Sequence, residues 1–318
     1  MSKIRVAVVG AGQFGRNHMR VVRELPNAEL AGITDTNGER AAEAAAAFEC
    51  PALALEELAG KVDAAIVAVP TSAHAEVGCA LLAAGVDVLV EKPIASDPAA
   101  ARRLVETARA GSRILQVGHL ERFNPAIAAL RKAVTLPLFF EVHRLSVFTP
   151  RSLDIDVVLD LMIHDLDVVL SLVDQEPEEI RAAGISILSK KVDIANVRLA
   201  FPSGCVANLT ASRVSTERVR KLRLFQPRQY ISLDYSRQEA SVFEVDAGRQ
   251  IGFHALPVEH SEPLRLEVDS FLHSVETREP PVVSGEDGCR ALDLALAILD
   301  KIEEHSRRVE QSLAAWKR

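Results

Sequence analysis

The sequence predicts an α/β domain with a parallel sheet, followed by an α+β domain with a large, mainly antiparallel open sheet. The chain has 318 residues, roughly twice the length of a typical domain. Up to His119, short β-branched runs alternate with alanine-rich amphipathic stretches, which is the order of a parallel sheet covered by helices. After Gly118, consecutive strands with short turns favour antiparallel pairing. We therefore expect domains at 1–119 and 120–318.

The elements of the first domain follow from this alternation. The expected strands are Ile4–Val9, Leu30–Thr34, Ala64–Val69, Val86–Val90 and Ile114–Val117. The expected helices are Gly15–Leu25, Glu39–Phe48, Ala73–Ala84 and Pro98–Ala110. Asp97-Pro98 marks the last helix start, because an N-cap acid precedes a proline whose missing N–H has no intrahelical partner to lose.

The second domain combines one apolar helix with many short strands. Asn124-Pro125 caps a first helix, and Val157–Val173 has a helical apolar stripe interrupted by polar residues. The expected strands are Leu138–Leu145, Ile180–Ile187, Val192–Phe201, Cys205–Ser212, Arg220–Leu224, Tyr230–Asp234 and Ala240–Val245. Helices at Pro263–Glu276 and Gly285–His305 close the chain.

Composition and charge exclude several classes of partner. The formal net charge is −7, so no overall positive field attracts nucleic acid or an anionic membrane. No apolar run approaches the ~18 residues of a membrane span. The cysteines lie far apart and lack metal-ligand spacing, which indicates a cytoplasmic protein without a metal site. They are Cys50, Cys79, Cys205 and Cys289.

A glycine-rich turn follows the first strand. Gly10-Ala11-Gly12-Gln13-Phe14-Gly15 is a GxGxxG motif between a strand and a helix, the context of a dinucleotide-binding Rossmann turn. Its glycines allow a tight turn, approach of backbone to a pyrophosphate and packing of helix on strand. Asp35 ends the next strand, where a carboxylate can accept hydrogen bonds from both ribose hydroxyls. A glycine turn with an unrelated aspartate is the alternative.

Asp35 also predicts which dinucleotide binds. A carboxylate at this position repels the 2′-phosphate of NADP, and no arginine follows it directly in Asp35-Thr36-Asn37-Gly38. The sequence therefore favours NAD. Arg40, five residues further on, could reach a phosphate, which leaves NADP as the less favoured cofactor.

Two further strands end in polar residues at the edge where open α/β sheets bind ligands. One ends in Val69-Pro70-Thr71 and the other in Glu91-Lys92-Pro93. Lys92 is unusual after an apolar run, and Pro93 fixes the direction in which the chain leaves. The alternative is that Lys92 is the first solvated residue after a strand.

Asp160 and His164 are four positions apart, which places an acid and an imidazole on one helix face. In the functional interpretation the aspartate orients the histidine, which acts as general base for an alcohol. The alternative is an ordinary surface hydrogen bond. Asp165 and Asp167 lie on other faces of the helix, so a metal cluster is not expected.

Together, Gly10–Gly15, Asp35, Glu91-Lys92-Pro93 and the Asp160/His164 pair resemble the glucose-fructose oxidoreductase and inositol dehydrogenase family, often called Gfo/Idh/MocA. The resemblance covers the whole chain and implies a terminal helix, about 285–305, that returns to the first domain. It also implies a homo-oligomer, a dimer or tetramer formed through the open sheet. By this resemblance the catalytic residues are Lys92, Asp160 and His164. The implied cofactor-binding residues are Gly10, Gly12, Gln13, Phe14, Gly15, Asp35, Pro70, Thr71, His74, Glu91 and Lys92.

A narrower resemblance lies in 117–125 and 162–167. Both segments are similar to the branch of the family that acts on nucleotide sugars, the UDP-N-acetylglucosamine 3-dehydrogenase type. Glu121 stands where inositol dehydrogenases usually have a second basic residue, which favours a nucleotide sugar over a free polyol. The expected substrate-binding residues are Glu121, Arg122, Glu141, His143 and His164. Glu141 and His143 alternate along a strand, so they point either toward substrate or toward solvent.

These resemblances imply, as the expected function, NAD-dependent oxidation of a secondary hydroxyl of a sugar, with the 3-hydroxyl of UDP-N-acetylglucosamine as the expected site. Lys92 would stabilise the alkoxide, His164 would take the proton and Asp160 would orient it. Inositol or free-sugar oxidation, reduction of another carbonyl or imine, and non-catalytic NAD-dependent regulation remain as alternatives.

A basic segment could neutralise a substrate diphosphate. Its residues are Arg213, Arg218, Arg220, Lys221 and Arg223. Alternatively, Arg220, Lys221 and Arg223 mark the solvated side and end of an edge strand, where charges discourage aggregation.

Overall fold

The computed structural model describes residues 3–149, 154–246 and 248–316, which form two compact units. The first unit comprises the described residues up to Phe123 together with Ser261–Leu292. The second comprises Asn124–His260 and the described residues from Asp293 onward. The segment 261–284, which the sequence predicts in the second domain, thus belongs to the first unit. No helix in the described ranges is both long and apolar enough to span a membrane.

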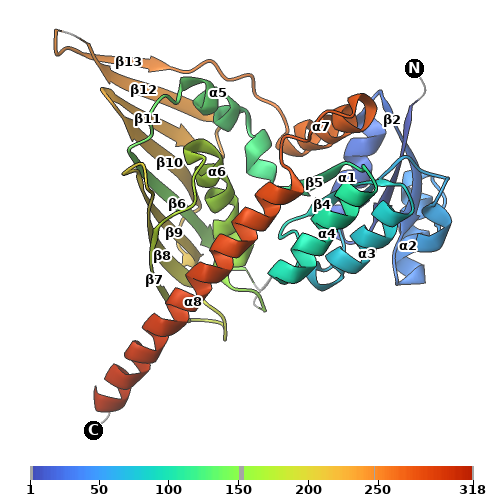
Figure 1. The fold of residues 1–318 in the computed structure, drawn as a ribbon, viewed down its shortest axis with the longest axis horizontal. Coiled ribbons are helices and arrows are strands. Elements are labelled where there is room, and N and C mark those ends of the chain that lie inside the picture. The colour runs from blue at the N-terminus through green and yellow to red at the C-terminus, as the bar shows by residue number, and fades with distance from the viewer. Residues whose placement is uncertain (1–2, 150–153, 247, 317–318) are drawn as a thin grey trace. The chain divides into compact units, whose positions relative to one another are not determined.

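A five-stranded parallel sheet forms the centre of the first unit (Figure 1). Its order is β2-β1-β3-β4-β5, and each neighbouring pair runs parallel. The strands are β1 (Ile4–Val9), β2 (Ala28–Thr34), β3 (Ala64–Val67), β4 (Asp87–Glu91) and β5 (Leu115–Gly118). All five were predicted, within a few residues at their ends. Because the order reverses beside β1, the carboxyl ends of β1 and β3 form the edge where such sheets bind ligands.

Helices connect these strands. They are α1 (Gln13–Glu24), α2 (Gly38–Phe48), α3 (Thr71–Ala83) and α4 (Pro98–Ala110), with short 3₁₀ turns η1 (Leu55–Leu58) and η2 (Leu120–Phe123). The predicted cap of α4 is confirmed, because the Asp97 carboxylate accepts a hydrogen bond from the Ala100 N–H at 2.9 Å. Helix α7 (Pro263–Thr277) packs against α1 and η2.

The main core of the first unit lies between the sheet and α1 and α7. Val8 and Ile66 from the strands, Met19 from α1 and Phe271 from α7 belong to one buried cluster. Burial of each large apolar side chain contributes roughly 1.5–3 kcal/mol. This core therefore fixes α1 and α7 relative to the strand ends.

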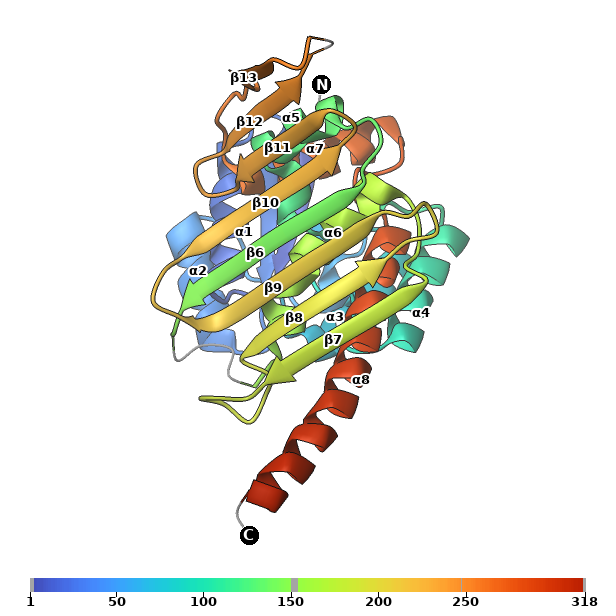
Figure 2. The same cartoon turned by 90° about the vertical axis from the view of Figure 1, so that its left-hand side faces the viewer.

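An eight-stranded sheet dominates the second unit (Figure 2). Its order is β13-β12-β11-β10-β6-β9-β8-β7, and only the β6–β9 pair is parallel. The strands are β6 (Phe139–Val147), β7 (Glu179–Ile185), β8 (Ile194–Ala200), β9 (Val206–Ser215), β10 (Val219–Gln226), β11 (Gln229–Asp234), β12 (Glu239–Val245) and β13 (Ile251–Ala255). The mainly antiparallel open sheet is confirmed. The exposed edge strand β13 was not predicted.

Helices α5 (Pro125–Ala133) and α6 (Ile163–Val173) lie on one face of this sheet (Figure 2). The helix expected over Val157–Val173 is confirmed, but its first part is not regular α-helix. Val158–Met162 is a π-helical turn, η3, in which the Ile163 N–H donates to the Val158 carbonyl five residues back. Such turns occur as short insertions in α-helices and frequently accompany functional sites.

The long helix α8 (Gly285–Trp316) contributes to both units. In the first unit, a Cβ at Gly288 would lie 2.7 Å from a Val117 methyl carbon, so this glycine permits close packing of α8 on β5. In the second unit, Ile302 packs against Gly184 of β7, where a Cβ would meet Ile302 Cγ2 at 2.7 Å.

Candidate functional site

The GxGxxG turn has the geometry that its glycines predict. Gly10 has a φ of +103°, and a Cβ there would lie 2.5 Å from the Ala68 carbonyl oxygen. A Cβ at Gly15 would lie 1.8 Å from the Gly10 carbonyl oxygen, so any larger residue would force α1 away from β1. At Gly12, by contrast, a Cβ would meet no heavy atom within 4 Å. The turn is therefore closed toward the sheet and open at Gly12.

Asp35 lies beside this turn and organises it. Its carboxylate accepts hydrogen bonds from the backbone N–H groups of Ala11 and Asn37, each at 2.8 Å. The Arg40 guanidinium lies 3.6 Å from the same carboxylate, while the Asp35 side chain is 6% exposed. The chain thus places one fixed carboxylate and one exposed cation at the end of β2.

His74 connects the ends of β3 and β4. From α3, its Nδ1 lies 2.8 Å from the Pro93 carbonyl oxygen and its Nε2 lies 2.9 Å from the Val69 carbonyl oxygen. Burial lowers the pKa of His74, although the surrounding carbonyl groups oppose that shift. A neutral imidazole carries one N–H, so His74 donates to one of these two carbonyl oxygens while its ring lies between the two segments.

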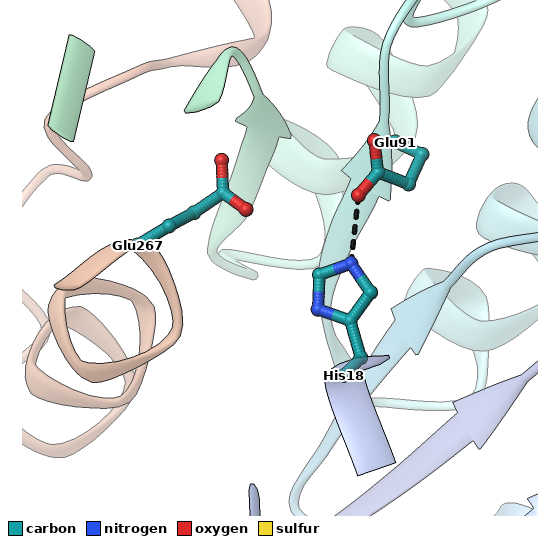
Figure 3. A group of neighbouring side chains, drawn as sticks. All are labelled: His18, Glu91 and Glu267. Atoms are coloured by element: carbon teal, nitrogen blue, oxygen red, sulfur yellow. Dashed lines mark hydrogen bonds and ion pairs between the residues drawn. The ribbon is translucent and has the colours of Figure 1, made fainter. Parts of the chain in front are cut away.

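Glu91 forms a buried junction at the end of β4 (Figure 3). Its Oε1 atom lies 2.7 Å from His18 Nε2 in α1, and its Oε2 atom accepts the Lys92 backbone N–H at 3.3 Å. Glu267 in α7 points toward the same junction, and ligand atoms of His18, Glu91 and Glu267 lie within 4.8 Å of one another. Lys92 is half-buried beside it.

The segment after β5 is also largely buried in the first unit. Burial, with the nearby charges of Lys92 and Arg122, lowers the pKa of His119 to about 3, so His119 is neutral at physiological pH. The Arg122 guanidinium donates to the Val282 carbonyl oxygen at 3.0 Å and lies 4.0 Å from Asp287. Glu121 is buried as well.

Asp160 and His164 lie across the junction between η3 and α6. An i→i+5 bonded turn holds more residues per turn than an α-helix, and residues four apart remain on about the same face. Both side chains are half-buried. The structure thus keeps the spacing that the acid–imidazole interpretation needs, although the local helix differs from the prediction.

Two buried acids, one in α6 and one in the loop before β8, lie in the same unit. Asp165 receives a bidentate ion pair from Arg144 of β6, at 2.6 and 2.9 Å, and both side chains are almost fully buried. Asp193 accepts backbone N–H bonds from Ile187, Leu188 and Ser189. Burial opposes ionisation of Asp193, but the Ser189 hydroxyl and these N–H groups outweigh it and lower its pKa to about 2.

Glu141 and His143 lie on the other face of the β6 strand. Their neighbours Phe140, Val142 and Arg144 point toward α6 and are buried, and side chains alternate along a strand. Glu141 Oε2 accepts a hydrogen bond from Arg223 of β10 at 3.0 Å. This arrangement corresponds to the solvent-facing alternative that the sequence left open.

The basic segment is distributed rather than clustered. Arg213 is buried, donates to the Ile155 carbonyl oxygen and lies 3.7 Å from Asp193, so it serves the fold. Lys221 and Arg223 belong to β10, which lies between β11 and β6. The edge-strand interpretation of these charges is therefore wrong, because strand order in the sheet does not follow chain order.

Sequence reasoning missed three buried polar residues of the first unit. His18 and Glu267 meet Glu91, and Gln116 donates from Nε2 to the backbone carbonyl of Glu267 at 3.1 Å. A detectable signal existed. Each is a polar residue at a position where the helix or strand pattern requires an apolar one.

The strand edge fits a dinucleotide. Gly12 is the N-cap of α1 and provides no side-chain cap, so the first N–H groups of the helix face the open side of the turn. Asp35 supplies the acceptor at the end of β2. These features match the pyrophosphate and ribose requirements of such a cofactor.

Comparisons with known proteins agree with this geometry. Residues 4–119 match the GFO/IDH/MocA model described as an oxidoreductase family with an NAD-binding Rossmann fold. Residues 137–230 match the GFO/IDH/MocA C-terminal domain. The chain is 37% identical to UDP-N-acetylglucosamine 3-dehydrogenase of Acidithiobacillus ferrooxidans, over 97% of this chain and 100% of that protein.

A solved structure and a second relative give the same result. A structure of the Acidithiobacillus ferrooxidans enzyme has a TM-score of 0.91 at 36% identity, covering 96% of this chain and 99% of that chain. The myo-inositol 2-dehydrogenase of Thermotoga maritima is 28% identical over 95% of this chain and 97% of that protein.

Proposed function

The chain belongs to the GFO/IDH/MocA oxidoreductase family, and from this premise we propose that it oxidises the 3-hydroxyl of UDP-N-acetylglucosamine with NAD. One observation carries the choice of substrate. The dehydrogenase of that nucleotide sugar matches the chain at 37% identity over nearly its whole length, against 28% for an inositol dehydrogenase.

The NAD site consists of the glycine turn and the strand ends around it. Backbone at Gly10, Gly12, Gln13, Phe14 and Gly15 would hold the pyrophosphate, and Asp35 would accept the ribose hydroxyls. Pro70, Thr71, His74, Glu91 and Lys92 would border the remainder of the cofactor. Bound NAD supplies the hydride acceptor for the oxidation.

Three side chains carry the proton and charge transfers. The Lys92 ammonium donates a hydrogen bond to the reacting oxygen and stabilises negative charge on it. The His164 imidazole takes the hydroxyl proton, and Asp160 holds the imidazole in the required orientation. Glu121 and Arg122 would recognise the substrate. Glu141 and His143 are weaker candidates, because they occupy the β6 face away from α6.

A substrate panel tests this proposal. UDP-N-acetylglucosamine, other UDP-sugars, free myo-inositol and free glucose are each incubated with NAD, and absorbance of the reduced nicotinamide is followed. We expect the highest kcat/KM with UDP-N-acetylglucosamine. A higher kcat/KM with free inositol or glucose would refute the proposed substrate, while the proposal that the protein is a dehydrogenase would stand. A chain that binds NAD and oxidises none of them would instead be a regulator or would act on another carbonyl.

A second copy of the chain is the expected partner. On the sheet face away from α6, an aromatic ladder runs from β6 to β13, with ring centroids 4.8 Å apart for Phe225–Tyr230 and 4.9 Å for Phe243–Phe253. Phe253 is 63% exposed. An exposed apolar face of this kind favours association. Light scattering should give a dimer or tetramer, and Phe243→Lys should shift it toward monomer.

Cytoplasmic location is part of the same proposal. All four cysteines carry free thiols, as expected in a reducing compartment. Fractionation of the producing cells tests it, with recovery in an oxidising compartment as the contrary result.

A further inference from the structure

The junction formed by His18, Glu91 and Glu267 contains more buried acid than the dinucleotide site requires. The exposed fractions of these residues are 0%, 8% and 1%. Glu91 is engaged on both oxygens, by His18 and by the Lys92 backbone. Neither carboxyl oxygen of Glu267 has a hydrogen-bond partner among the described residues, although the side chain points into the junction (Figure 3).

Two ionised carboxylates cannot share this space without a compensating positive charge. Both lie in the apolar layer between the sheet and α7, and a second anion within 4.8 Å of Glu91 would be destabilised by repulsion and by loss of water. A proton on one carboxyl group removes the conflict. Glu91 keeps the negative charge because its carboxylate already accepts hydrogen bonds from His18 and from the Lys92 backbone N–H. The proton therefore belongs on Glu267.

A divalent cation is the competing occupant of this junction, since a histidine and two carboxylates are possible ligands. The His18 Nε2 and Glu91 Oε1 atoms are 2.7 Å apart, however, which is the length of a charge-assisted hydrogen bond. Two ligands held ~2.0–2.2 Å from one zinc ion in a tetrahedral site are further apart than that. The distance therefore favours protons.

We propose that Glu267 is a positioning residue that, as a neutral carboxylic acid, keeps Glu91 ionised and thereby holds the Lys92 backbone in place. The inference rests on the proposed function only in so far as Lys92 acts on the substrate. Glu267 touches Glu91 and not the reacting atoms. Burial, followed by the Glu91 charge, raises the pKa of Glu267 well above its usual range, in agreement with this state.

Other charged groups near α7 are already engaged or lie at its ends. From α1, Arg20 pairs with Glu24 and Glu262 at the exposed start of α7. From β4, Asp87 pairs with Arg278 at its C-cap. The η2 turn contributes Glu121 and Arg122, and His119 next to it is neutral. Among the residues that the structure describes, Glu91 and His18 have ligand atoms within 4.8 Å of those of Glu267, and Glu91 is the charged group that shifts its pKa.

Three variants test the proposal. Glu267→Gln keeps the shape and neutrality of the acid, Glu267→Leu removes its polar atoms, and Glu276→Gln changes a glutamate at the end of the same helix as a control. The first measurement is independent of activity. The infrared difference spectrum between wild type and Glu267→Gln at pH 7 should contain the carbonyl band of a protonated carboxylic acid, which the control difference lacks. Absence of that band overturns the proposal.

The second measurement is the pH profile of kcat. We expect Glu267→Gln to retain at least half of the wild-type kcat at pH 7 and to lose less activity than wild type as the pH rises. Glu267→Leu should lower kcat about tenfold or more while the Kd for NAD changes less than threefold. If kcat falls equally with rising pH in wild type and in Glu267→Gln, the positioning role is contradicted.

Two controls complete the test. The first distinguishes a proton in the junction from a bound cation, and the second keeps the protonation state of Glu267 measurable even if the proposed reaction does not occur. Metal analysis of the wild-type holoprotein should find less than a tenth of a divalent ion per chain. If the wild type instead contains one divalent ion per chain and the Glu267→Gln variant contains none, the junction binds a cation and not a proton. If no substrate is turned over, the infrared band and the melting temperature still decide the protonation state. The melting temperature of Glu267→Gln minus that of wild type should increase with pH, and a flat difference contradicts a buried neutral acid.

Discussion

Replacing Asp35 by serine should shift the cofactor preference of the protein from NAD toward NADP. The Asp35 carboxylate accepts two backbone N–H bonds, from Ala11 and Asn37, and its side chain is 6% exposed. It is therefore fixed in position with or without a ligand. A hydroxyl can replace only one of these acceptor contacts and carries no charge.

The size of the effect follows from two terms. Hydrogen bonds from ribose hydroxyls to a charged acceptor contribute about 1.5–3 kcal/mol, so their loss weakens NAD binding about tenfold or more. Two unit charges ~4 Å apart at an effective dielectric of 20 repel by about 4 kcal/mol. If solvent screening leaves a third of this repulsion, its removal strengthens NADP binding about tenfold. The ratio of the two dissociation constants should then change about 100-fold.

Arg40 adds to this change. It lies 3.6 Å from Asp35 in the wild type, and loss of the carboxylate frees its guanidinium to pair with a 2′-phosphate. The assay is calorimetric titration of wild type and Asp35→Ser with NAD and NADP. Glu29→Gln is the matched control, since it removes one negative charge at the opposite end of β2. Tighter binding of NADP than NAD by the wild type, or a ratio changed less than threefold, would refute the reasoning.

Four further outcomes are expected. Lys92→Met and His164→Ala should each lower kcat by ~10² or more, with the Kd for NAD little changed. Asp160→Ala should lower kcat less than His164→Ala does. Near-normal kcat of these variants in steady-state kinetics would contradict their assignment as catalytic residues. Gly15→Ala should abolish NAD binding, because its Cβ would lie 1.8 Å from the Gly10 carbonyl oxygen, whereas Gly12→Ala should retain the fold by circular dichroism. Arg144→Met should destabilise the second unit by about 3–5 kcal/mol in urea unfolding, since it leaves Asp165 buried without its cation. The pKa of Asp193 in the folded protein is about 2, below its usual 3.8, so its ionised carboxylate stabilises the fold above pH 4 and this contribution is lost as the pH falls through 2. The free energy of unfolding of wild type minus that of Asp193→Asn should therefore decrease as the pH falls from 4 to 2.

The predictable parts of the fold are those determined by neighbouring residues. The glycine turn, the Asp97 and Asn124 caps and the five parallel strands depend on segments of fewer than about 15 residues, where periodicity and turn chemistry suffice. The strand order of the second sheet depends on pairings between distant segments. For that reason the position of Arg223 in an interior strand was not predictable, and an edge strand was a reasonable but wrong expectation.

The π-helical turn η3 illustrates another limit. The residues Val158–Met162 have an apolar pattern compatible with an α-helix, and no proline or glycine interrupts them. Their conformation depends on anchors outside the segment, including the Val157 N–H bonded to the Val192 carbonyl and the Val192 N–H bonded to Asp156. The sequence therefore predicted the face that carries Asp160 and His164 but not the turn that presents it.

The buried junction of the first unit lay within reach of sequence reasoning. In α7, Leu264, Val268 and Phe271 define the buried stripe, and Glu267 lies between them. In α1, His18 likewise lies beside Met19 among buried residues. An ionisable residue on the buried stripe of an amphipathic helix must find a polar partner or lose its charge. Two such helices packed on one sheet share few polar groups, and Glu91 ends the buried strand β4 of that sheet. The pattern of exceptions to amphipathicity therefore indicates where buried polar side chains meet.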